Sequence, residues 1–269
     1  MSTSALKPTT ERASELRANL SEIRDRIKQA YGSAPRSTSY RREPTFVAVS
    51  KYKPASDIVG CYQDGQRDYG ENYVQELVDK AAQLPQDIRW YFIGTLQSNK
   101  AKMLATIPNL YSIHTLTSQK TASSLNKYLP ETRTDPLNVF IQVNTSGEDN
   151  KSGLAPSLSS PSELLDLANH VVMACPRLKL LGLMTIGSLA ESLHAKEALE
   201  NRDFEALARV RDQLEEKLRE GEGGKWGDED GRLILSMGMS ADFEAAIRSG
   251  SGMVRVGSSV FGERRKKGE

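Results

Sequence analysis

The chain has 269 residues, and 36 lysines and arginines against 35 aspartates and glutamates leave a formal net charge of +1, which argues against a nucleic acid or an anionic membrane as partner. No stretch approaches the roughly 20 apolar residues of a membrane span. Transit peptides contain few acidic residues, whereas this N-terminus contains Glu11, Glu15 and Glu22. Two distant cysteines, Cys61 and Cys175, lack ligand spacing, so we expect a cytoplasmic protein with one core, an association with mitochondria being left open.

The first predicted element is a helix over Thr10–Ala30. Its apolar residues recur at helical spacing and are Leu16, Leu20, Ile23 and Ile27. The polar residues 32–39 that follow include Gly and Pro and predict an exposed connector. We therefore expect residues 1–44 to form a helix and connector that pack on the domain that follows.

From Thr45 onward, short apolar runs rich in β-branched and aromatic residues alternate with longer helical stretches. The runs predict eight strands, of which the second is weak: Thr45–Ser50, Arg67–Gly70, Arg89–Gly94, Leu110–His114, Leu137–Asn144, Leu178–Gly187, Arg232–Met237 and Met253–Gly257. The stretches between them predict helices over Asn72–Leu84, Ser98–Ile107, Ser118–Tyr128, Ser162–Ala174, Arg202–Glu220 and Ser240–Ser249. Apolar strands that are each followed by a helix indicate a parallel sheet covered on both faces.

Eight such units in about 250 residues are typical of a closed (β/α)8 barrel, which we predict as one domain over residues 45–262. A doubly wound open sheet is the structural alternative. Two inserts, the polar residues 148–161 and the Gly-rich residues 221–231 with a lone Trp226, predict surface loops. Residues 263–269 form a basic tail, which we interpret as a solvated end rather than a targeting or anion-binding segment.

Reactive groups in such a barrel follow the carboxyl ends of the strands. Lys51 directly follows the first predicted strand, where partial desolvation disfavours the ammonium form. A neutral amine at this position is a nucleophile toward aldehydes and would form a Schiff base. A lysine that simply ends the strand in water is the alternative, and Lys53 could face the same way.

The seventh and eighth strands end in Ser236–Ser240 and Gly257–Ser259. We expect Ser240 to be the N-cap of a helix that begins at Ala241. The N–H groups of that helix start, Gly257 and the two following hydroxyls would then form an anion cradle, and phosphate sites recur after these strands. Capping and a tight turn with no ligand remain the alternative.

Arg255 interrupts the apolar eighth strand, and a guanidinium in that position needs an acceptor or a counter-charge. If it shares a face with Met253 and Gly257, strand alternation directs it into the barrel. A salt bridge to a buried carboxylate is the structural alternative.

Other chemistry finds little support in the sequence. The histidines, His114, His170 and His194, have no metal-ligand spacing, and no Gly-rich nucleotide loop follows a strand. Residues 90–92 are expected to be strand packing rather than a base-stacking platform.

Seven segments match a known family in the right order: Val47–Pro54, Tyr69–Glu76, Trp90–Lys100, Gln142–Asn144, Lys151–Gly153, Leu235–Ser240 and Met253–Gly257. Together they closely resemble the YggS/PROSC family of pyridoxal 5′-phosphate homeostasis proteins. The resemblance runs from about Thr45 to Gly262. It implies a single (β/α)8 barrel of the alanine-racemase N-terminal type, pyridoxal phosphate fold type III, that binds pyridoxal 5′-phosphate.

The resemblance also implies roles by motif position. Lys51 would form the Schiff base, Asn72 would lie beside the cofactor, Arg255 would face the pyridine nitrogen, and Ser240, Gly257 and Ser258 would hold the phosphate with backbone help from Met239. The sequence departs from the family pattern at Tyr52 and Ser258, where Thr is common, and in the longer segment 221–231. The first two changes keep a hydroxyl, and the third leaves partner contacts open.

These roles point to a carrier rather than a dedicated catalyst. A cationic Arg255 at the ring nitrogen would keep that nitrogen unprotonated and weaken the cofactor as an electron sink. The resembling racemases take a second base from an additional β domain, which we do not expect in a chain that ends at Glu269. We expect a monomer that supplies the cofactor to apo-enzymes.

Three other functions compete with this interpretation. The first is an amino-acid racemase or lyase of the same fold type with Tyr52 or Tyr69 as the second base. The second is a phosphosugar-type barrel enzyme without pyridoxal, and the third is a pure scaffold. For the second, Lys51→Ala would not change the absorption spectrum, and for the third, loss of Lys51 would leave the cellular function intact.

Overall fold

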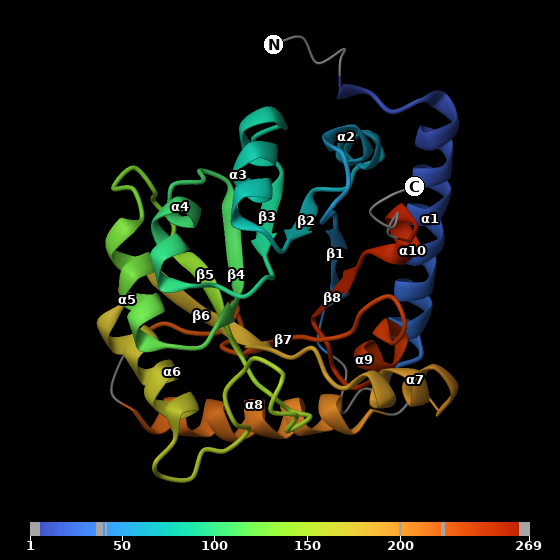
Figure 1. Cartoon of the computed structure of the whole chain (residues 1–269). Helices are drawn as coiled ribbons and strands as arrows, with labels where there is room; N and C mark the ends of the chain where they lie inside the picture. Colours follow the sequence, from blue (N-terminus) through green and yellow to red (C-terminus); the bar gives the residue numbers. More distant parts are fainter. Residues whose placement is uncertain (1–5, 36–39, 41, 199–200, 222–223, 264–269) are drawn as a thin grey trace.

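The computed structural model describes residues 6–35, 40, 42–198, 201–221 and 224–263. Its eight parallel strands form a closed barrel in chain order, and β1 pairs with β8 (Figure 1). The strands are β1 (Thr45–Val49), β2 (Asp68–Glu71), β3 (Arg89–Phe92), β4 (Leu110–Leu116), β5 (Leu137–Gln142), β6 (Leu178–Met184), β7 (Ile234–Ser236) and β8 (Met253–Val256). The predicted barrel is confirmed, and the closing β1–β8 pair excludes the open sheet.

Helices cover the outside of the barrel, as the alternation of patterns predicts. They are α1 (Thr10–Gly32), α2 (Ala55–Gln63), α3 (Val74–Gln83), α4 (Ala101–Ala105), α5 (Gln119–Tyr128), α6 (Glu163–Ala174), α7 (Leu189–Ala198), α8 (Arg202–Glu220), α9 (Phe243–Arg248) and α10 (Ser258–Phe261), with a 3-10 turn η2 at Ser98–Lys100. Periodicity predicts neither α2 nor α7. α2 is short and contains Gly60, and α7 leaves Leu189 and Leu193 exposed, so neither follows a simple buried stripe.

The core has two layers, one inside the barrel and one between strands and helices. The inner layer consists of Val47, Tyr91, Phe140, Leu181, Met184 and Met253. Trp90 and Phe92 face the helices instead, because alternate residues of a strand point to opposite faces. All three aromatic residues of β3 are buried, which confirms that they pack in the core.

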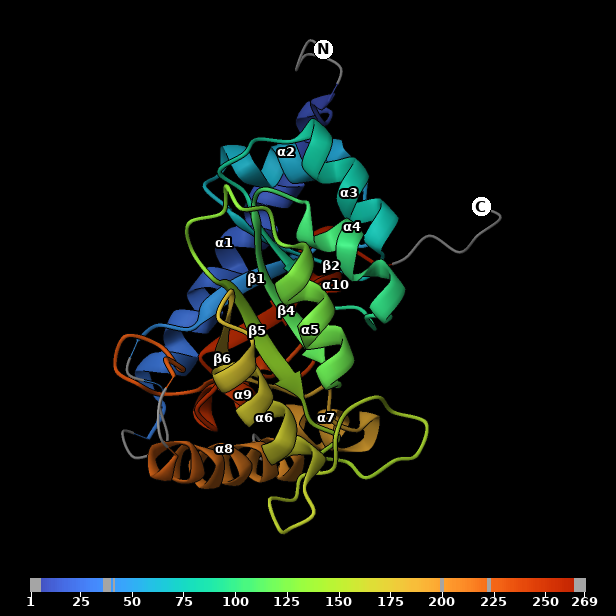
Figure 2. The ribbon, with the colours of Figure 1, turned by 90° about the vertical axis from the view of Figure 1, so that its left-hand side faces the viewer.

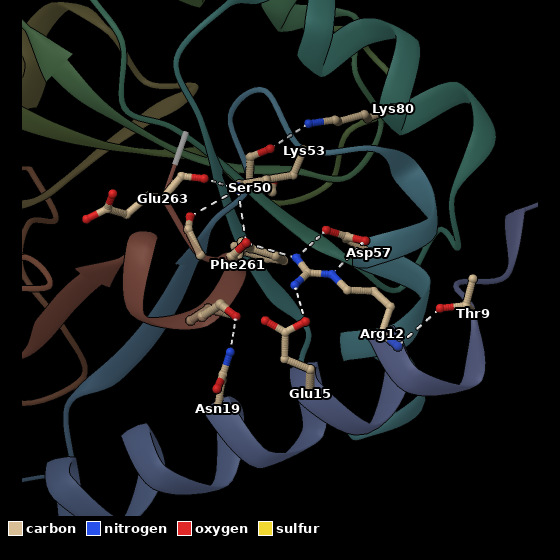
Figure 3. Close-up of polar contacts among 12 residues, drawn as sticks. Thr9, Arg12, Glu15, Asn19, Ser50, Lys53, Asp57, Lys80, Phe261 and Glu263 are labelled. Atoms are coloured by element: carbon tan, nitrogen blue, oxygen red, sulfur yellow. Dashed lines mark hydrogen bonds and ion pairs between the residues drawn. The ribbon is translucent and has the colours of Figure 1, made fainter. Parts of the chain in front are cut away.

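The leading helix is part of this architecture, because α1 packs against α2, α9 and α10 (Figure 1). The apolar residues that predict the helix are all buried, namely Leu16, Leu20, Ile23 and Ile27. Arg12 adds polar contacts to Asp57 on α2 at 2.7 Å and to the Phe261 carbonyl of α10 at 2.9 Å (Figure 3). α1 therefore braces the wall of the barrel that β1 and β8 form.

Both inserts lie at the surface as predicted, but each is anchored. Leu154 in the first insert is buried and bridges to Val143, and Figure 2 shows this loop projecting near α8. In the second, Trp226 packs against the core, and Asp228 accepts a hydrogen bond from Tyr40 at 2.5 Å. Residues 222–223 of the second insert and residues 264–269 of the basic tail lie outside the described residues. No helix in the described ranges is long and apolar enough to cross a membrane.

Candidate functional site

All seven residues that the sequence nominates line one pocket, with a volume of about 450 Å³, at the carboxyl ends of the strands. They are Lys51, Asn72, Met239, Ser240, Arg255, Gly257 and Ser258. Val49, Lys53, Ile93, Met184, Ile186, Ala241 and Gly262 complete the lining. Ser259, whose hydroxyl is also a predicted part of the anion cradle, does not line the pocket.

Lys51 follows β1 at a sharp change of chain direction. Its neighbour Tyr52 has a φ of 62°, in a left-handed region that costs a non-glycine residue on the order of 1 kcal/mol or more. The Lys53 amide closes the turn by donating to the Ser50 carbonyl at 3.0 Å. This turn separates the strand from α2 and leaves Lys51 in the pocket wall.

Lys53 also lines the pocket, but its amine is engaged in capping. Its Nζ donates to the carbonyls of Phe261 and Gly262 at 3.0 Å and of Glu263 at 3.1 Å (Figure 3). Three carbonyl partners at the end of α10 make it a structural cation.

A buried charged group that the sequence analysis does not predict lies behind Lys51. Lys80 on α3 donates to Glu71 Oε1 at 2.6 Å and to Glu76 Oε1 at 2.7 Å. Ser50 Oγ also donates to Glu71 Oε1, at 2.6 Å. Burial raises the pKa of Glu71 to about 6, against the opposing effect of Lys80. The available signal is that Lys80 falls beside Leu77 and Ala81, on the apolar face of its helix.

Asn72 lies where β2 ends, close to the end of β3. A Cβ added at Gly94 would lie 1.9 Å from the Asn72 carbonyl oxygen, so only glycine allows this approach. The buried side-chain oxygen Oδ1 of Asn72 makes no hydrogen bond in the part of the chain that the structure describes. Since buried polar atoms are normally paired, this oxygen indicates a polar ligand in the pocket.

Two loops bring the residues of the predicted anion cradle together, without a helix cap at Ser240. α9 begins at Phe243, and the prediction that Ser240 is its N-cap is wrong. Ser240 Oγ instead accepts a hydrogen bond from the Gly257 amide at 3.2 Å and ties the two loops together. The Met239 amide donates to Asp242 Oδ1 at 2.7 Å, so it would have to exchange this partner to bind a phosphate.

Arg255 points into the barrel, where it is almost fully buried. It donates to Ser236 Oγ at 2.6 Å and to the Thr185 carbonyl at 2.7 Å. Burial lowers its pKa to about 10, which leaves the guanidinium charged at neutral pH. Neutral acceptors thus supply the printed hydrogen bonds of the guanidinium, while the buried carboxylate of Asp242 favours its charge from a greater distance.

Ser236 connects Arg255 to His114, which is fully buried. Ser236 Oγ accepts from the guanidinium and can therefore donate its own hydrogen to His114 Nδ1, at 3.1 Å. Burial, and then the charge of Arg255, hold the pKa of His114 well below its usual value. The imidazole is thus a neutral acceptor beneath the pocket.

Tyr52 and Tyr69, the two candidates for a second base, do not line the pocket. Tyr69 is buried on the outer side of the barrel, where its hydroxyl donates to the Ile58 carbonyl at 3.1 Å. Tyr52 is 58% exposed, and its hydroxyl contacts that of Tyr73. Tyr69 as a base in this pocket is therefore wrong.

The pocket suits a phosphorylated aldehyde. It combines an amine, a guanidinium, hydroxyls and the unpaired Asn72 oxygen in one cavity. At Gly257 the loop comes close to β1, because an added Cβ would meet the Val49 carbonyl oxygen at 3.2 Å. The donor set fits the pyridoxal phosphate that the family resemblance implies.

Comparison with curated proteins identifies close relatives over most of the chain. The pyridoxal phosphate homeostasis protein of Mus musculus is 41% identical over 252 residues, 91% of this chain and 85% of the mouse protein. That of Schizosaccharomyces pombe is 41% identical over 251 residues, 93% of this chain and 94% of the yeast protein. That of Vibrio cholerae is 39% identical over 254 residues, which are 93% of this chain and 96% of the bacterial protein.

Solved structures show the same barrel. PipY of Synechococcus elongatus, solved with PLP bound, is 27% identical with a TM-score of 0.69, over 91% of this chain and 99% of PipY. An alanine racemase from Corynebacterium glutamicum, 15% identical with a TM-score of 0.59, shares the fold over 92% of this chain and 60% of the racemase. The family model for the alanine racemase N-terminal domain matches residues 13–265. The chain thus belongs to the pyridoxal phosphate homeostasis protein family, built on the alanine racemase N-terminal barrel.

Proposed function

We propose that this protein binds pyridoxal 5′-phosphate as a Schiff base on Lys51 and acts as a reversible carrier in the homeostasis of that cofactor. The observation that carries the proposal is the convergence of Lys51, Arg255 and the Ser240–Gly257 contact on one pocket. The relatives named for pyridoxal phosphate homeostasis and the PLP-bound structure of PipY support the same ligand.

Different residues of the chain are proposed to contact the phosphate, the ring and the aldehyde of the cofactor. Ser240, Gly257 and Ser258 would hold the phosphate, and Met239 would add its amide on exchange of its partner Asp242. Asn72 would lie beside the ring, and Arg255 would face the pyridine nitrogen. The cofactor would supply an aldehyde, and condensation with the unprotonated form of the Lys51 amine would form one C=N bond and release the carbonyl oxygen as water with both amine hydrogens.

The lining of the pocket favours carrying over catalysis. Apart from the two lysines and Arg255, the described lining residues have no titratable side chain, and Lys53 is engaged by three carbonyls. A racemase needs two positioned bases, one on each face of the substrate, and the lining offers only Lys51 for such a role. The charge of Arg255 also disfavours protonation of the ring nitrogen, on which an electron sink depends.

The carrier proposal includes its cellular setting. The protein acts as a monomer in the cytoplasm, and apo-enzymes that require pyridoxal phosphate receive the cofactor from it. Reversibility follows from the chemistry of a Schiff base, since another amine can displace Lys51 without oxidation or reduction.

The test is reduction with borohydride followed by mass spectrometry. After incubation with pyridoxal 5′-phosphate, we expect one adduct on the Lys51 peptide, none in Lys51→Ala and a full adduct in Lys53→Met. An adduct on another lysine in the unmodified protein would overturn the assignment. Turnover of common amino acids at about 1 s⁻¹ or faster, as in ordinary enzymes, would overturn the carrier role.

A further inference from the structure

Two peptide units flank the Cα of Lys51, and one charged group holds both, with Glu71 and Lys80 buried and the Glu76 side chain 21% exposed. On the preceding side, Lys80 Nζ donates to the Ser50 carbonyl at 2.8 Å (Figure 3). On the following side, the Tyr52 amide donates to Glu76 Oε1 at 2.7 Å. Lys80 and Glu76 are themselves paired at 2.7 Å. The segment that carries Lys51 is therefore fixed at both ends by the same ion pair.

The conformation that these contacts hold is a strained one. Tyr52 has a φ of 62°, which a residue with a side chain adopts at a cost of roughly 1–3 kcal/mol. A strained residue persists only where its surroundings impose it. The amide of this strained residue donates a hydrogen bond to Glu76, so Glu76 is placed to hold Tyr52 at its positive φ.

The charged group is costly in itself, which separates it from ordinary packing. Glu71 is fully buried and Lys80 has a side-chain exposure of 8%. Apolar residues of similar size would pack at least as stably in such a position. A lysine supplies what they cannot, namely three directed N–H donors, and they reach Ser50, Glu71 and Glu76.

We infer that Glu71, Lys80 and Glu76 are positioning residues that orient the amine of Lys51 for condensation with an aldehyde. We call this group the Lys51 clamp. The inference rests on the proposed function, because it assumes that Lys51 is the amine that reacts. None of the three residues lines the pocket, and the contacts described above connect the clamp to the backbone of residues 50–52.

The decisive comparison is Glu76→Ala against Glu76→Gln, because Gln keeps an acceptor for the Tyr52 amide and for Lys80. Asp79→Ala, an exposed residue one turn further along α3, is the matched control. Stopped-flow absorbance measures the rate of Schiff-base formation with pyridoxal 5′-phosphate. Calorimetry measures the affinity for pyridoxine 5′-phosphate, an alcohol that fits the pocket but cannot condense.

We expect Glu76→Ala to slow condensation about tenfold, since small misplacements of a reacting group have effects of this size. Glu76→Gln and Asp79→Ala should stay within about twofold of the parent, and pyridoxine 5′-phosphate should bind all four proteins within about twofold. Condensation of Glu76→Ala at the parental rate, or an equal loss of pyridoxine 5′-phosphate affinity, would refute the clamp. Absence of an adduct on Lys51 in the parent would instead refute the proposed function.

The same comparison in a protein that carries Tyr52→Gly tests whether the clamp acts through the strained turn. Glycine adopts a positive φ without steric cost, so Tyr52→Gly should make the turn less dependent on Glu76. We expect Glu76→Ala to slow condensation by less than about threefold in this background, against about tenfold in the parent. An undiminished tenfold effect would show that Glu76 does not hold the turn.

Discussion

The two walls of the pocket are built differently. The wall formed by the ends of β1, β2 and β8 holds Lys51, Asn72 and Gly257, and α1 braces it through Arg12 and Asn19 (Figure 3). The wall formed by β6 and α7 holds Ile186 and continues into Leu189 and Leu193, which are 74% and 58% exposed. The first wall is held by hydrogen bonds from α1, while the second presents apolar side chains to solvent.

This difference separates two requirements of a reversible carrier. An amine that must condense needs a fixed backbone, and polar contacts from Lys80 and Glu76 hold the chain on both sides of Lys51. The α7 wall is tied at its base, where Lys151 donates to the Gly187 carbonyl at 2.7 Å and Ser192 donates to Asp242 at 2.5 Å. Above that base, Leu189 and Leu193 are exposed, and segments with few buried contacts open most easily.

The largest expected effect comes from the packing of α1. Leu20 is fully buried in the core between α1 and the barrel. We expect Leu20→Ala to lower the free energy of unfolding by about 2–5 kcal/mol, because it removes buried methyl groups and leaves a cavity. Urea denaturation measures the loss. Leu20→Met keeps the volume and should cost less than about 1.5 kcal/mol, and equal losses in both variants would contradict the packing argument.

A smaller loss is expected where α1 is tied to the site by charge. Arg12→Ala leaves the mostly buried carboxylate of Asp57 without its partner and should cost about 1–3 kcal/mol. Arg17 pairs with Asp64 at 2.7 Å but is 69% exposed, so Arg17→Ala should cost less than about 1 kcal/mol. Thermal unfolding of the two variants gives the comparison. Similar shifts would mean that α1 does not brace this wall through Arg12.

Much of the braced wall could be predicted from sequence. Strands buried on both faces are continuous apolar runs, so the pattern alone places the residues directly after them at one end of a barrel. Lys51 and Asn72 follow from this rule and Arg255 from strand alternation, each together with the matched motifs, and all three line the pocket.

The features that sequence could not supply depend on contacts between distant elements. Lys80 falls on the apolar face of its helix, but only the fold brings the Ser50 carbonyl to it. The predicted Ser240 cap is wrong because the Asp242 carboxylate takes the Met239 amide and α9 starts later. Periodicity does not reveal α7 because its leucines are exposed, and exposed leucines do not form a buried stripe.

His114 lies buried beneath the pocket, and we expect it to make the free energy of unfolding depend on pH. Its pKa is held well below the ordinary value of 6.5, so the folded state keeps it neutral while the unfolded chain takes up a proton below about pH 6.5. Stability from this residue is therefore present above that pH and is lost as the pH falls, at up to about 1.4 kcal/mol per pH unit.

The variant that tests this is His114→Asn, whose side-chain oxygen can still accept from Ser236. We expect its free energy of unfolding to fall less steeply than that of the parent between about pH 6.5 and 5, by roughly 1–2 kcal/mol over the range. His194→Asn, at an exposed position on α7, serves as the control. Parallel pH profiles for the parent and His114→Asn would show that the histidine does not stay neutral in the folded protein.

The smallest effect is expected on the open wall, and its smallness is informative. Leu189 and Leu193 lie one helical turn apart, and both are exposed. Leu189→Ser with Leu193→Ser should change the free energy of unfolding by no more than about 0.5 kcal/mol per site, as surface substitutions do. Denaturation and the rate of condensation with pyridoxal 5′-phosphate are the measurements. A loss of several kcal/mol would mean that these side chains pack against something in the folded chain. A slower condensation at unchanged stability would mean that the open wall takes part in closing the pocket, and the division between a fixed wall and a free one would then be wrong.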